Sequence, residues 1–451
     1  MVFKSINPYN LQVLAEYPLL EERQLDDKLK LSENAFEQWA TSSLPSRALL
    51  FQRLAMGLRK EKEELAKLMT LEMGKPILES RAEIEKCALT CLYYAEHGES
   101  ILQPETMGME GVHSQVSFLP TGAVFAVMPW NFPFWQVFRY AVPTLIAGNV
   151  TLLKHAPNVC GCALALEKVF READFPEGVF QTVIIDIPLV EKIIQSEIVQ
   201  GVTLTGSGMA GASVASLAGK HMKKTVLELG GSDPFIVLED ADLSLASDMA
   251  VKSRFQNAGQ SCIAAKRFIV AEKVKEEFLQ RVVGQCEKLK AGNPLDESTT
   301  LGPLARLDLA EKVEAQYQAT VQQGAKVLLE NKREGCKMAP MLVSDFPLSA
   351  SVFNEEVFGP LMAVYTVKDE SEAIQVANHT QFGLGASIWT QDVEKARRMT
   401  QKIKAGSVFV NSMMKSDPAV PFGGVKKSGY GRELSHFGMR EFVNIQTMVI
   451  G

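Results

Sequence analysis

The sequence predicts an α/β fold with two or three packed domains. Short apolar runs rich in β-forming residues alternate with amphipathic stretches between residues 123 and 205, and the alternation begins afresh after Gly231. This pattern is typical of parallel sheets, which bind ligands at the carboxyl ends of their strands. A chain of 451 residues is also too long for one simple core.

The first half of the chain predicts a helical region followed by the first strand–helix alternation. Between Asp26 and His97, charged and apolar residues recur at spacings of three and four, which is typical of amphipathic helices. Residues 112–120 alternate as a strand does. Further strands are expected at residues 123–129, 150–154, 179–185 and 202–205, and helices at 162–173 and 189–196.

A second α/β domain is expected to begin near Gly230. Strands are predicted at residues 235–238 and 267–270, and helices at 243–257, 274–290, 307–323 and 370–378. The tail at 441–450 has a strand-like pattern with nothing of its own to pair with. We therefore expect it to pair between subunits.

Composition and charge exclude several classes of protein. The chain is 46% hydrophobic and 22% charged, and its net charge is −6 with no basic block, which argues against a nucleic-acid partner. No apolar run approaches the length of a membrane helix, and the N-terminus lacks signal character, so a cytoplasmic location is expected. The seven cysteines show no disulfide framework or zinc spacing, and no metal site is expected.

Cys262 is the strongest candidate nucleophile. It ends the run FQNAGQSC, which begins at Phe255. A lone cysteine is more often a buried structural thiol. Here, however, a polar, glycine-containing turn supplies backbone N–H groups near the sulfur, and that setting favours covalent catalysis.

Glu228 is the candidate general base. It precedes Gly230 and Gly231 at the end of a β-rich run, so it does not lie on a helix face. The alternative is a charge on an edge strand. The two glycines let a ligand approach closely, which favours a carboxylate in the wall of a site.

Two further motifs suit the same chemistry. Asn131 lies between Trp130 and the Phe132-Pro133 pair, where its amide would stabilise a developing oxyanion, although capping of the next helix is the alternative. The run GSGMAG from Gly206 follows a strand and offers free N–H groups to a phosphate.

Together these motifs resemble the NAD(P)-dependent aldehyde dehydrogenase superfamily, from Asn7-Pro8 to the tail. The resemblance implies that Cys262 is the nucleophile, Glu228 the base and Asn131 the oxyanion donor. It implies that the cofactor contacts are Trp130, Lys154, Gly206, Ser207, Glu356 and Phe358. The block from Pro421 to Glu433 also matches the family's C-terminal pattern.

The resemblance also implies a domain plan, with a Rossmann-like cofactor domain, an α/β catalytic domain and a small oligomerisation sheet. The expected cofactor domain covers residues 1–229, of which 106–120 join the oligomerisation sheet. The catalytic domain covers 230–411, the chain returns to the cofactor domain at 412–434, and 435–451 form an oligomerisation strand. A homodimer or homotetramer is expected.

Within the superfamily the chain resembles the bacterial succinate-semialdehyde enzymes of the NAD(P) type. Arg139 stands where members acting on semialdehyde acids carry arginine, and a guanidinium suits the distal carboxylate of such a substrate. Ser416 is a further expected contact. A second arginine of those relatives is replaced here by Gln256, so glutarate semialdehyde or an unsubstituted aliphatic aldehyde is the alternative substrate.

The cofactor is expected to be NADP or NAD. Many NAD-preferring relatives carry glutamate three residues after the lysine that matches Lys154, and this chain has Pro157 there. Without that carboxylate, Lys154 and His155 would attract a 2′-phosphate, so we expect NADP to be accepted.

Other functions that would use the Cys262 thiol have weaker support in the sequence. Glu228 argues against a CoA-acylating enzyme, whose relatives commonly lack this base. No histidine lies in a recognisable partner motif for a cysteine hydrolase. The intact set of motifs argues against a non-catalytic member.

Overall fold

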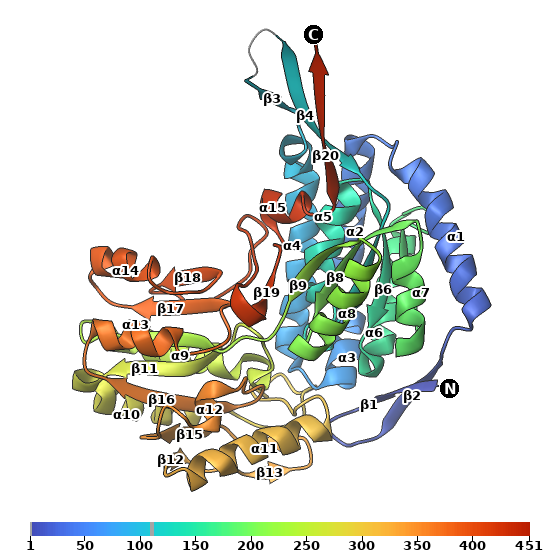
Figure 1. Cartoon of the computed structure of the whole chain (residues 1–451). Coiled ribbons are helices and arrows are strands. Elements are labelled where there is room, and N and C mark those ends of the chain that lie inside the picture. Colours follow the sequence, from blue (N-terminus) through green and yellow to red (C-terminus); the bar gives the residue numbers. More distant parts are fainter. Residues whose placement is uncertain (1, 109–111) are drawn as a thin grey trace.

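Two mostly parallel sheets form the centres of two lobes, and a third, narrow sheet projects from the first lobe as an arm (Figure 1). The computed structural model describes residues 2–108 and 112–451. The sheets and the helices packed against them confirm the predicted α/β class.

The sheet of the first lobe has six strands in the order β19-β9-β8-β5-β6-β7. All neighbours are parallel except β19 and β9. Because β5 lies between β6 and β8, the direction of connection reverses beside it, and such a switch point is where open α/β sheets bind ligands. The strands are β5 (Ala123–Met128), β6 (Val150–His155), β7 (Phe180–Thr182), β8 (Val199–Thr205), β9 (Lys224–Glu228) and β19 (Gly429–Tyr430).

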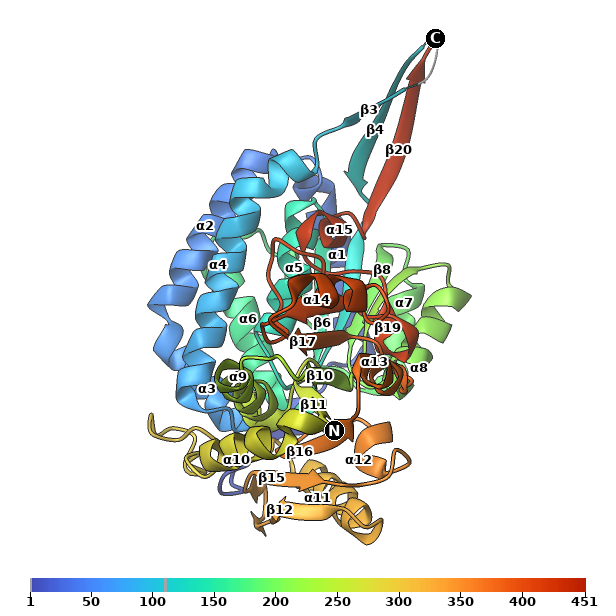
Figure 2. The same ribbon diagram turned by 90° about the vertical axis from the view of Figure 1, so that its left-hand side faces the viewer.

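Helices cover both faces of this sheet, and the long pair α2 and α4 runs along one side of the lobe (Figure 2). The twelve residues of α5 are all buried. At the N-terminus of α5, Glu83 accepts hydrogen bonds from Phe134 N and Trp135 N, both 2.9 Å. The helices are α1 (Glu22–Trp39), α2 (Leu44–Lys60), α3 (Lys62–Met73), α4 (Ile77–Ile101), α5 (Trp135–Ile146), α6 (Cys160–Glu172), α7 (Val190–Gln195) and α8 (Gly208–Lys220).

The sheet of the second lobe has seven strands in the order β12-β15-β16-β11-β10-β17-β18. Only β12 is antiparallel to its neighbour. The strands are β10 (Asp233–Val237), β11 (Ala265–Ala271), β12 (Lys326–Leu329), β15 (Met341–Ser344), β16 (Leu361–Val367), β17 (Gly385–Trp389) and β18 (Ser407–Val410). The helices are α9 (Leu243–Phe255), α10 (Lys275–Cys286), α11 (Leu307–Gln322), α12 (Ser351–Asn354), α13 (Glu370–Asn378) and α14 (Val393–Thr400).

The arm corrects the expectation that the terminal strand has no partner of its own. β20 (Val443–Ile450) pairs antiparallel with β4 (His113–Pro120) along its whole length, and β3 (Glu105–Met107) lies on the far side of β4. The predicted strand 435–451 also begins too early, because Ser435–Met439 form α15. Of the segment 106–120, residues 109–111 lie outside the described residues.

Two other differences concern short strands. The strand expected at 179–185 is limited to the three residues of β7. The N-terminal segment forms a hairpin of β1 (Val2–Ile6) and β2 (Val13–Pro18), which the periodicity did not reveal; a further small hairpin joins β13 (Arg333–Glu334) to β14 (Lys337–Met338).

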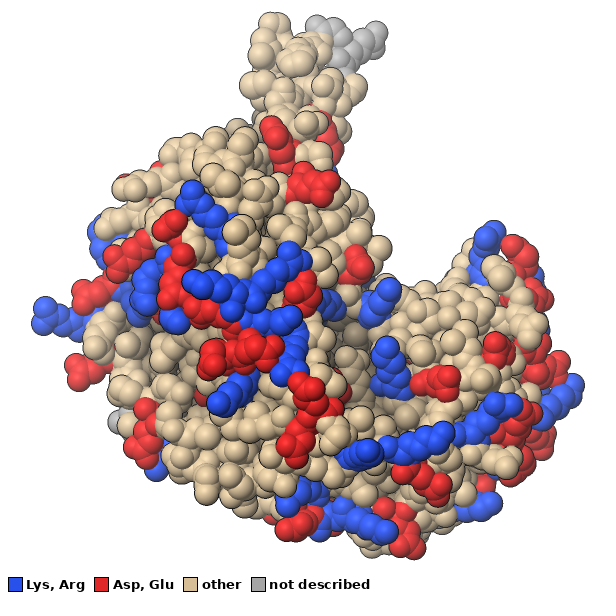
Figure 3. All heavy atoms as spheres, turned by 180° about the vertical axis from the view of Figure 1, so that it is seen from behind, with Lys and Arg blue, Asp and Glu red and all other residues tan. Residues whose placement is uncertain are grey.

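Charge on the surface is mixed. Figure 3 shows acidic and basic side chains interspersed over the back of both lobes, while the arm is mostly uncharged. In the described part of the chain, no helix combines the length and the apolar character needed to cross a membrane.

Candidate active site

Residues of both lobes meet in a pocket of about 270 Å³. It lies at the carboxyl ends of β5, β8 and β9, beside the switch point of the first sheet. Eight of the predicted site residues line it: Trp130, Asn131, Gly206, Ser207, Glu228, Cys262, Glu356 and Phe358. Lys154, Arg139 and Ser416 do not line this pocket.

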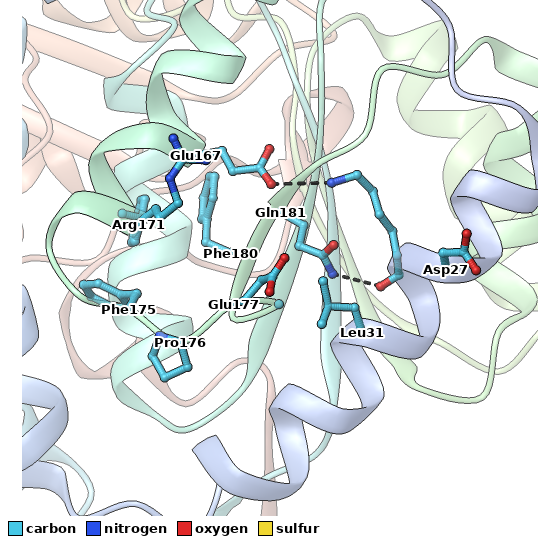
Figure 4. Close-up of a pocket in the computed structure, with 12 residues that line it drawn as sticks. Asp27, Leu31, Glu167, Arg171, Phe175, Pro176, Glu177, Phe180 and Gln181 are labelled. Atoms are coloured by element: carbon cyan, nitrogen blue, oxygen red, sulfur yellow. Dashed lines mark hydrogen bonds and ion pairs between the residues drawn. The ribbon is translucent and has the colours of Figure 1, made fainter.

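A larger cavity, of about 510 Å³, lies elsewhere, between α1, the end of α6 and β7 (Figure 4). Polar groups in this cavity already have partners within the protein. Lys28 forms an ion pair with Glu167 at 3.4 Å, and Gln181 donates a hydrogen bond to the Lys28 carbonyl at 2.8 Å. It holds no cysteine and none of the predicted site residues. The predicted site residues therefore gather in the smaller pocket between the lobes.

The loop that carries Cys262 has an unusual backbone. Asn257 and Ala258 both have a positive φ, 50° and 52°, which non-glycine residues rarely adopt. Arg254 anchors this loop by donating to the carbonyls of Gly259, Ala265, Val357 and Gly359. Lys266 donates to the carbonyls of Ser261 and Cys262, both at 2.8 Å.

Glu79 of α4 holds the same loop from the first lobe. Its Oε2 accepts a hydrogen bond from Asn257 N at 2.8 Å. Burial raises the pKa of this carboxyl to about 7, while Lys75 and the hydrogen bond from Asn257 oppose the rise. The two lobes are thus joined directly at the loop that carries Cys262.

The Cys262 thiol is poorly solvated. Burial raises its pKa to about 12, and the positive charges of Arg139 and Lys266 oppose that rise. At neutral pH the protein on its own therefore holds a thiol at this position. Deprotonation needs a base or a further positive charge in the pocket.

Asn131 is fixed beside this thiol. Its Nδ2 donates to Gln260 O at 3.0 Å, and its backbone oxygen accepts from Asn257 Nδ2 at 2.8 Å. An amide nitrogen carries two hydrogens, so one remains for a ligand. The backbone N–H of Cys262 donates to no acceptor among the described residues, and both groups are available to an oxyanion.

Glu228 ends β9 with its side chain buried. Both carboxyl oxygens lack a hydrogen-bond partner in the described part of the chain, which is rare for a buried carboxyl. Burial raises its pKa well above the usual range, Arg139 opposes this, and Glu433 adds to it. Two unpartnered oxygens in the wall of a pocket are suited to hold and deprotonate water.

Arg139 is buried behind this carboxyl. It forms an ion pair with Glu433, donates to Thr205 Oγ1 at 3.3 Å, and lies over the Phe422 ring at 4.4 Å. Its charge is therefore balanced within the protein. Its role as a contact for a substrate carboxylate stays a prediction, as does that of Ser416.

The wall of the pocket next to Glu228 offers contacts for a phosphate and a sugar. Ser207 caps α8 by accepting from Ala210 N at 3.2 Å. Contrary to the sequence prediction, the N–H of the preceding Gly206 is not free, because it donates to Glu228 O at 3.0 Å. An anion would therefore bind at the N-terminus of α8 after Gly206. Glu356 accepts from Gly231 N at 3.0 Å. A Cβ at Gly230 would meet the Glu356 carboxylate, so a larger residue here would displace that side chain from its position.

Aromatic rings complete this wall, and Lys154 lies outside it. Phe358 meets the Trp130 ring edge-on at 5.8 Å. Lys154 lies near the end of β6, where burial lowers its pKa and no described residue accepts a hydrogen bond from its ammonium group.

The neighbouring His155 couples the end of β6 to the Asn131 loop and makes stability pH-dependent. Its Nδ1 accepts from Ala156 N at 2.9 Å, so the proton lies on Nε2, which donates to Pro133 O at 2.8 Å. Burial lowers its pKa from 6.5 to about 4. A depressed pKa favours the neutral ring in the folded state. Its stabilising contribution is therefore present above pH 6.5 and is lost as pH falls through the folded pKa.

We expect this loss to reach about 2 kcal/mol at pH 5. Urea unfolding of the wild type and of His155→Gln at pH 8 and pH 5 measures it. The comparison removes the effects of other titrating groups, and the variant should lose less stability on acidification. An equal loss in both proteins would contradict the assignment.

Sequence reasoning missed the residues that support the site. Arg254, Lys266 and Glu79 act on the Cys262 loop, and Glu433 balances Arg139, yet none lies in a motif that marks these roles. One sequence signal could have identified them, namely a charged residue within an apolar run. Such a residue is expected to be buried, and charged residues are almost never fully buried unless they are paired. No cluster of three or more potential metal ligands occurs within residues 2–108 and 112–451.

Comparison with known proteins shows which family and which relatives this chain is similar to. Residues 1–448 match the model of the aldehyde dehydrogenase family. A Synechocystis protein named probable succinate-semialdehyde dehydrogenase (NADP+) is 46% identical, with 100% of both chains covered. An Escherichia coli K12 protein named succinate semialdehyde dehydrogenase (NAD(P)+) is 44% identical, with 98% of this chain and 97% of that protein covered.

A solved structure is similar over almost its entire length. It is the succinic semialdehyde dehydrogenase of Streptococcus pyogenes in complex with NADP+, with 35% identity, a TM-score of 0.97, and 99% of each chain covered.

Proposed function

The chain belongs to the aldehyde dehydrogenase family, and from that premise we propose that it oxidises succinate semialdehyde to succinate with NADP or NAD. The observation that carries this proposal is the single pocket that holds Cys262, Asn131 and the unpartnered carboxyl of Glu228. Relatives with 44–46% identity whose names specify this activity support the choice of substrate.

The residues of the pocket fit a nicotinamide dinucleotide. The open end of α8 at Gly206 and Ser207 suits a pyrophosphate, and Glu356 suits the hydroxyls of a ribose. Phe358 would pack beside the nicotinamide, with Trp130 next to it, and Lys154 would hold the adenosine ribose. When bound, the oxidised cofactor accepts a hydride and adds a positive charge to the pocket.

The protein's own residues divide the reaction into two stages. In the first, the Cys262 thiolate attacks the aldehyde carbon, and the resulting oxyanion accepts hydrogen bonds from Asn131 Nδ2 and the Cys262 backbone N–H. The aldehydic hydrogen leaves as hydride, which converts the thiohemiacetal into a thioester. In the second, Glu228 takes a proton from water, and the hydroxide releases the carboxylic acid and the thiol.

Glu228 also separates this activity from that of a CoA-acylating dehydrogenase, the less favoured alternative. A base with two unpartnered, buried oxygens serves hydrolysis, whereas transfer to a thiol cofactor needs no water at this place. The substrate's far carboxylate is assigned to the side of the site where Arg139 and Ser416 lie.

The arm supports assembly as a homodimer or homotetramer. β20 is the outer strand of its sheet, and the side chains of Ile445, Met448, Val449 and Ile450 are exposed on it. An uncovered apolar edge strand favours pairing with another chain.

Reduced-cofactor formation with three aldehydes and two cofactors tests the proposed function. Succinate semialdehyde, glutarate semialdehyde and butanal are each offered with NAD and with NADP. We expect kcat/KM to be highest for succinate semialdehyde, and NADP to be used. Equal or better use of butanal would leave only a general aldehyde dehydrogenase, and no turnover with NADP would overturn the cofactor assignment.

A further inference from the structure

We propose that Lys86 of α4 is a specificity-determining residue that binds the distal carboxylate of the substrate together with Ser416. This inference rests on the proposed function, because it names the group that recognises the acid end of the aldehyde. Lys86 lies outside every motif from which the site was predicted.

The hydrogen bonds at Ser416 leave its hydroxyl proton for a ligand. Ser416 Oγ accepts from Lys86 Nζ at 2.9 Å and from Trp135 Nε1 at 3.1 Å. A hydroxyl has two lone pairs and one hydrogen, so both acceptor positions are filled. No described residue accepts the remaining hydrogen, although Ser416 is buried. The site therefore presents an O–H donor that needs an acceptor.

Lys86 provides a cation that the protein does not balance. Its ammonium group lies 4.0 Å from the centre of the Trp135 ring, which fixes it without neutralising it. Among the residues that the structure describes, it forms no ion pair with a carboxylate. Arg139 differs, because Glu433 already balances its charge. A bound anion would therefore stabilise the charge of Lys86 more than that of Arg139.

The charges around Lys86 support the same role. Burial, and after it the nearby Arg139, lowers the pKa of Lys86 to about 8, although Cys87, Glu83 and Asp417 act in the opposite direction. Two neighbouring cations destabilise each other, and a carboxylate that contacts both would relieve this repulsion.

Lys86 lies on the elements that support the pocket, although Lys86, Trp135 and Ser416 do not themselves line it. Glu79, Glu83 and Lys86 recur at spacings of four and three, so they lie on one face of α4. Glu79 holds the Cys262 loop, and Glu83 accepts from the N-terminal N–H groups of α5. Trp135 directly precedes Gln136, which lines the pocket with Cys262. Lys86 thus belongs to the same support that positions the nucleophile.

Steady-state kinetics of Lys86→Met with succinate semialdehyde and butanal test the proposal. Methionine keeps the apolar stem against Trp135 and removes the charge. We expect the ratio of the two kcat/KM values to fall by about 10- to 100-fold, mainly through KM for the acid. Lys86→Arg keeps the positive charge, so its preference for succinate semialdehyde over butanal should be closer to that of the wild type. Lys67→Met, at an exposed position of α3, is the matched control.

The outcomes separate this proposal from the function on which it rests. A wild-type enzyme that does not prefer the acid would refute the proposed function itself. A wild-type preference that survives Lys86→Met within about twofold would overturn the role of Lys86 alone. Should Lys86→Met not fold, the same ratio for Ser416→Ala decides, because loss of its hydroxyl removes the other donor and an unchanged ratio would refute the paired site.

Discussion

Replacing Cys262 by serine is expected to lower kcat for aldehyde oxidation by roughly 10³-fold or more. A serine hydroxyl is a far weaker nucleophile than a thiolate, and the pocket offers no histidine to activate it. Burial already raises the pKa of the native thiol to about 12. The less acidic hydroxyl would remain protonated throughout, so the first stage of the reaction would stop.

Stopped-flow measurement of reduced-cofactor formation checks this expectation. The serine variant should show neither a first-turnover burst nor steady-state turnover. Cys336→Ala is the control, because Cys336 is also a free thiol but is buried and lies outside the pocket. Loss of the burst in the control, or its survival in Cys262→Ser, would contradict the assignment.

Replacing Glu228 by glutamine is expected to separate the two stages. The amide has almost the same size as the carboxyl but cannot take a proton from water. Hydride transfer should therefore occur once, while thioester hydrolysis and kcat fall by about 10²- to 10⁴-fold. The predicted trace is a burst close to one reduced cofactor per active site, followed by very slow turnover.

The control for this variant is Glu197→Gln, which changes an exposed glutamate in the same lobe. It should keep the wild-type time course. If Glu228→Gln lost the burst as completely as Cys262→Ser, Glu228 would be needed to activate the thiol and not only the water. If it kept full turnover, another group would be the base.

The candidate reactive residues were predictable from the sequence because each lies in a short local motif. Cys262 follows a glycine-containing turn, Glu228 precedes two glycines, and Asn131 lies between aromatic and proline residues. The structure places all three around one pocket. Local sequence also predicted the strand–helix alternation of both lobes, because a buried parallel strand and an amphipathic helix differ in periodicity.

The supporting residues were not accessible in this way, because their partners are distant in the chain. Arg139 is 294 residues from Glu433, and no local pattern reveals that its charge is balanced. Lys86 and Ser416 are 330 residues apart. The pairing of β20 with β4 likewise depends on how the chain returns to the first lobe. Such contacts follow from the topology and not from periodicity.

The measurement that tests the central claim most directly is mass spectrometry of Glu228→Gln after mixing with succinate semialdehyde and NADP. We expect a succinyl group, in thioester linkage, on the peptide that contains Cys262. Cys262→Ser under the same conditions should carry no such adduct. An unmodified Cys262 at a time when reduced cofactor has formed, or an adduct on another residue, would contradict the covalent mechanism.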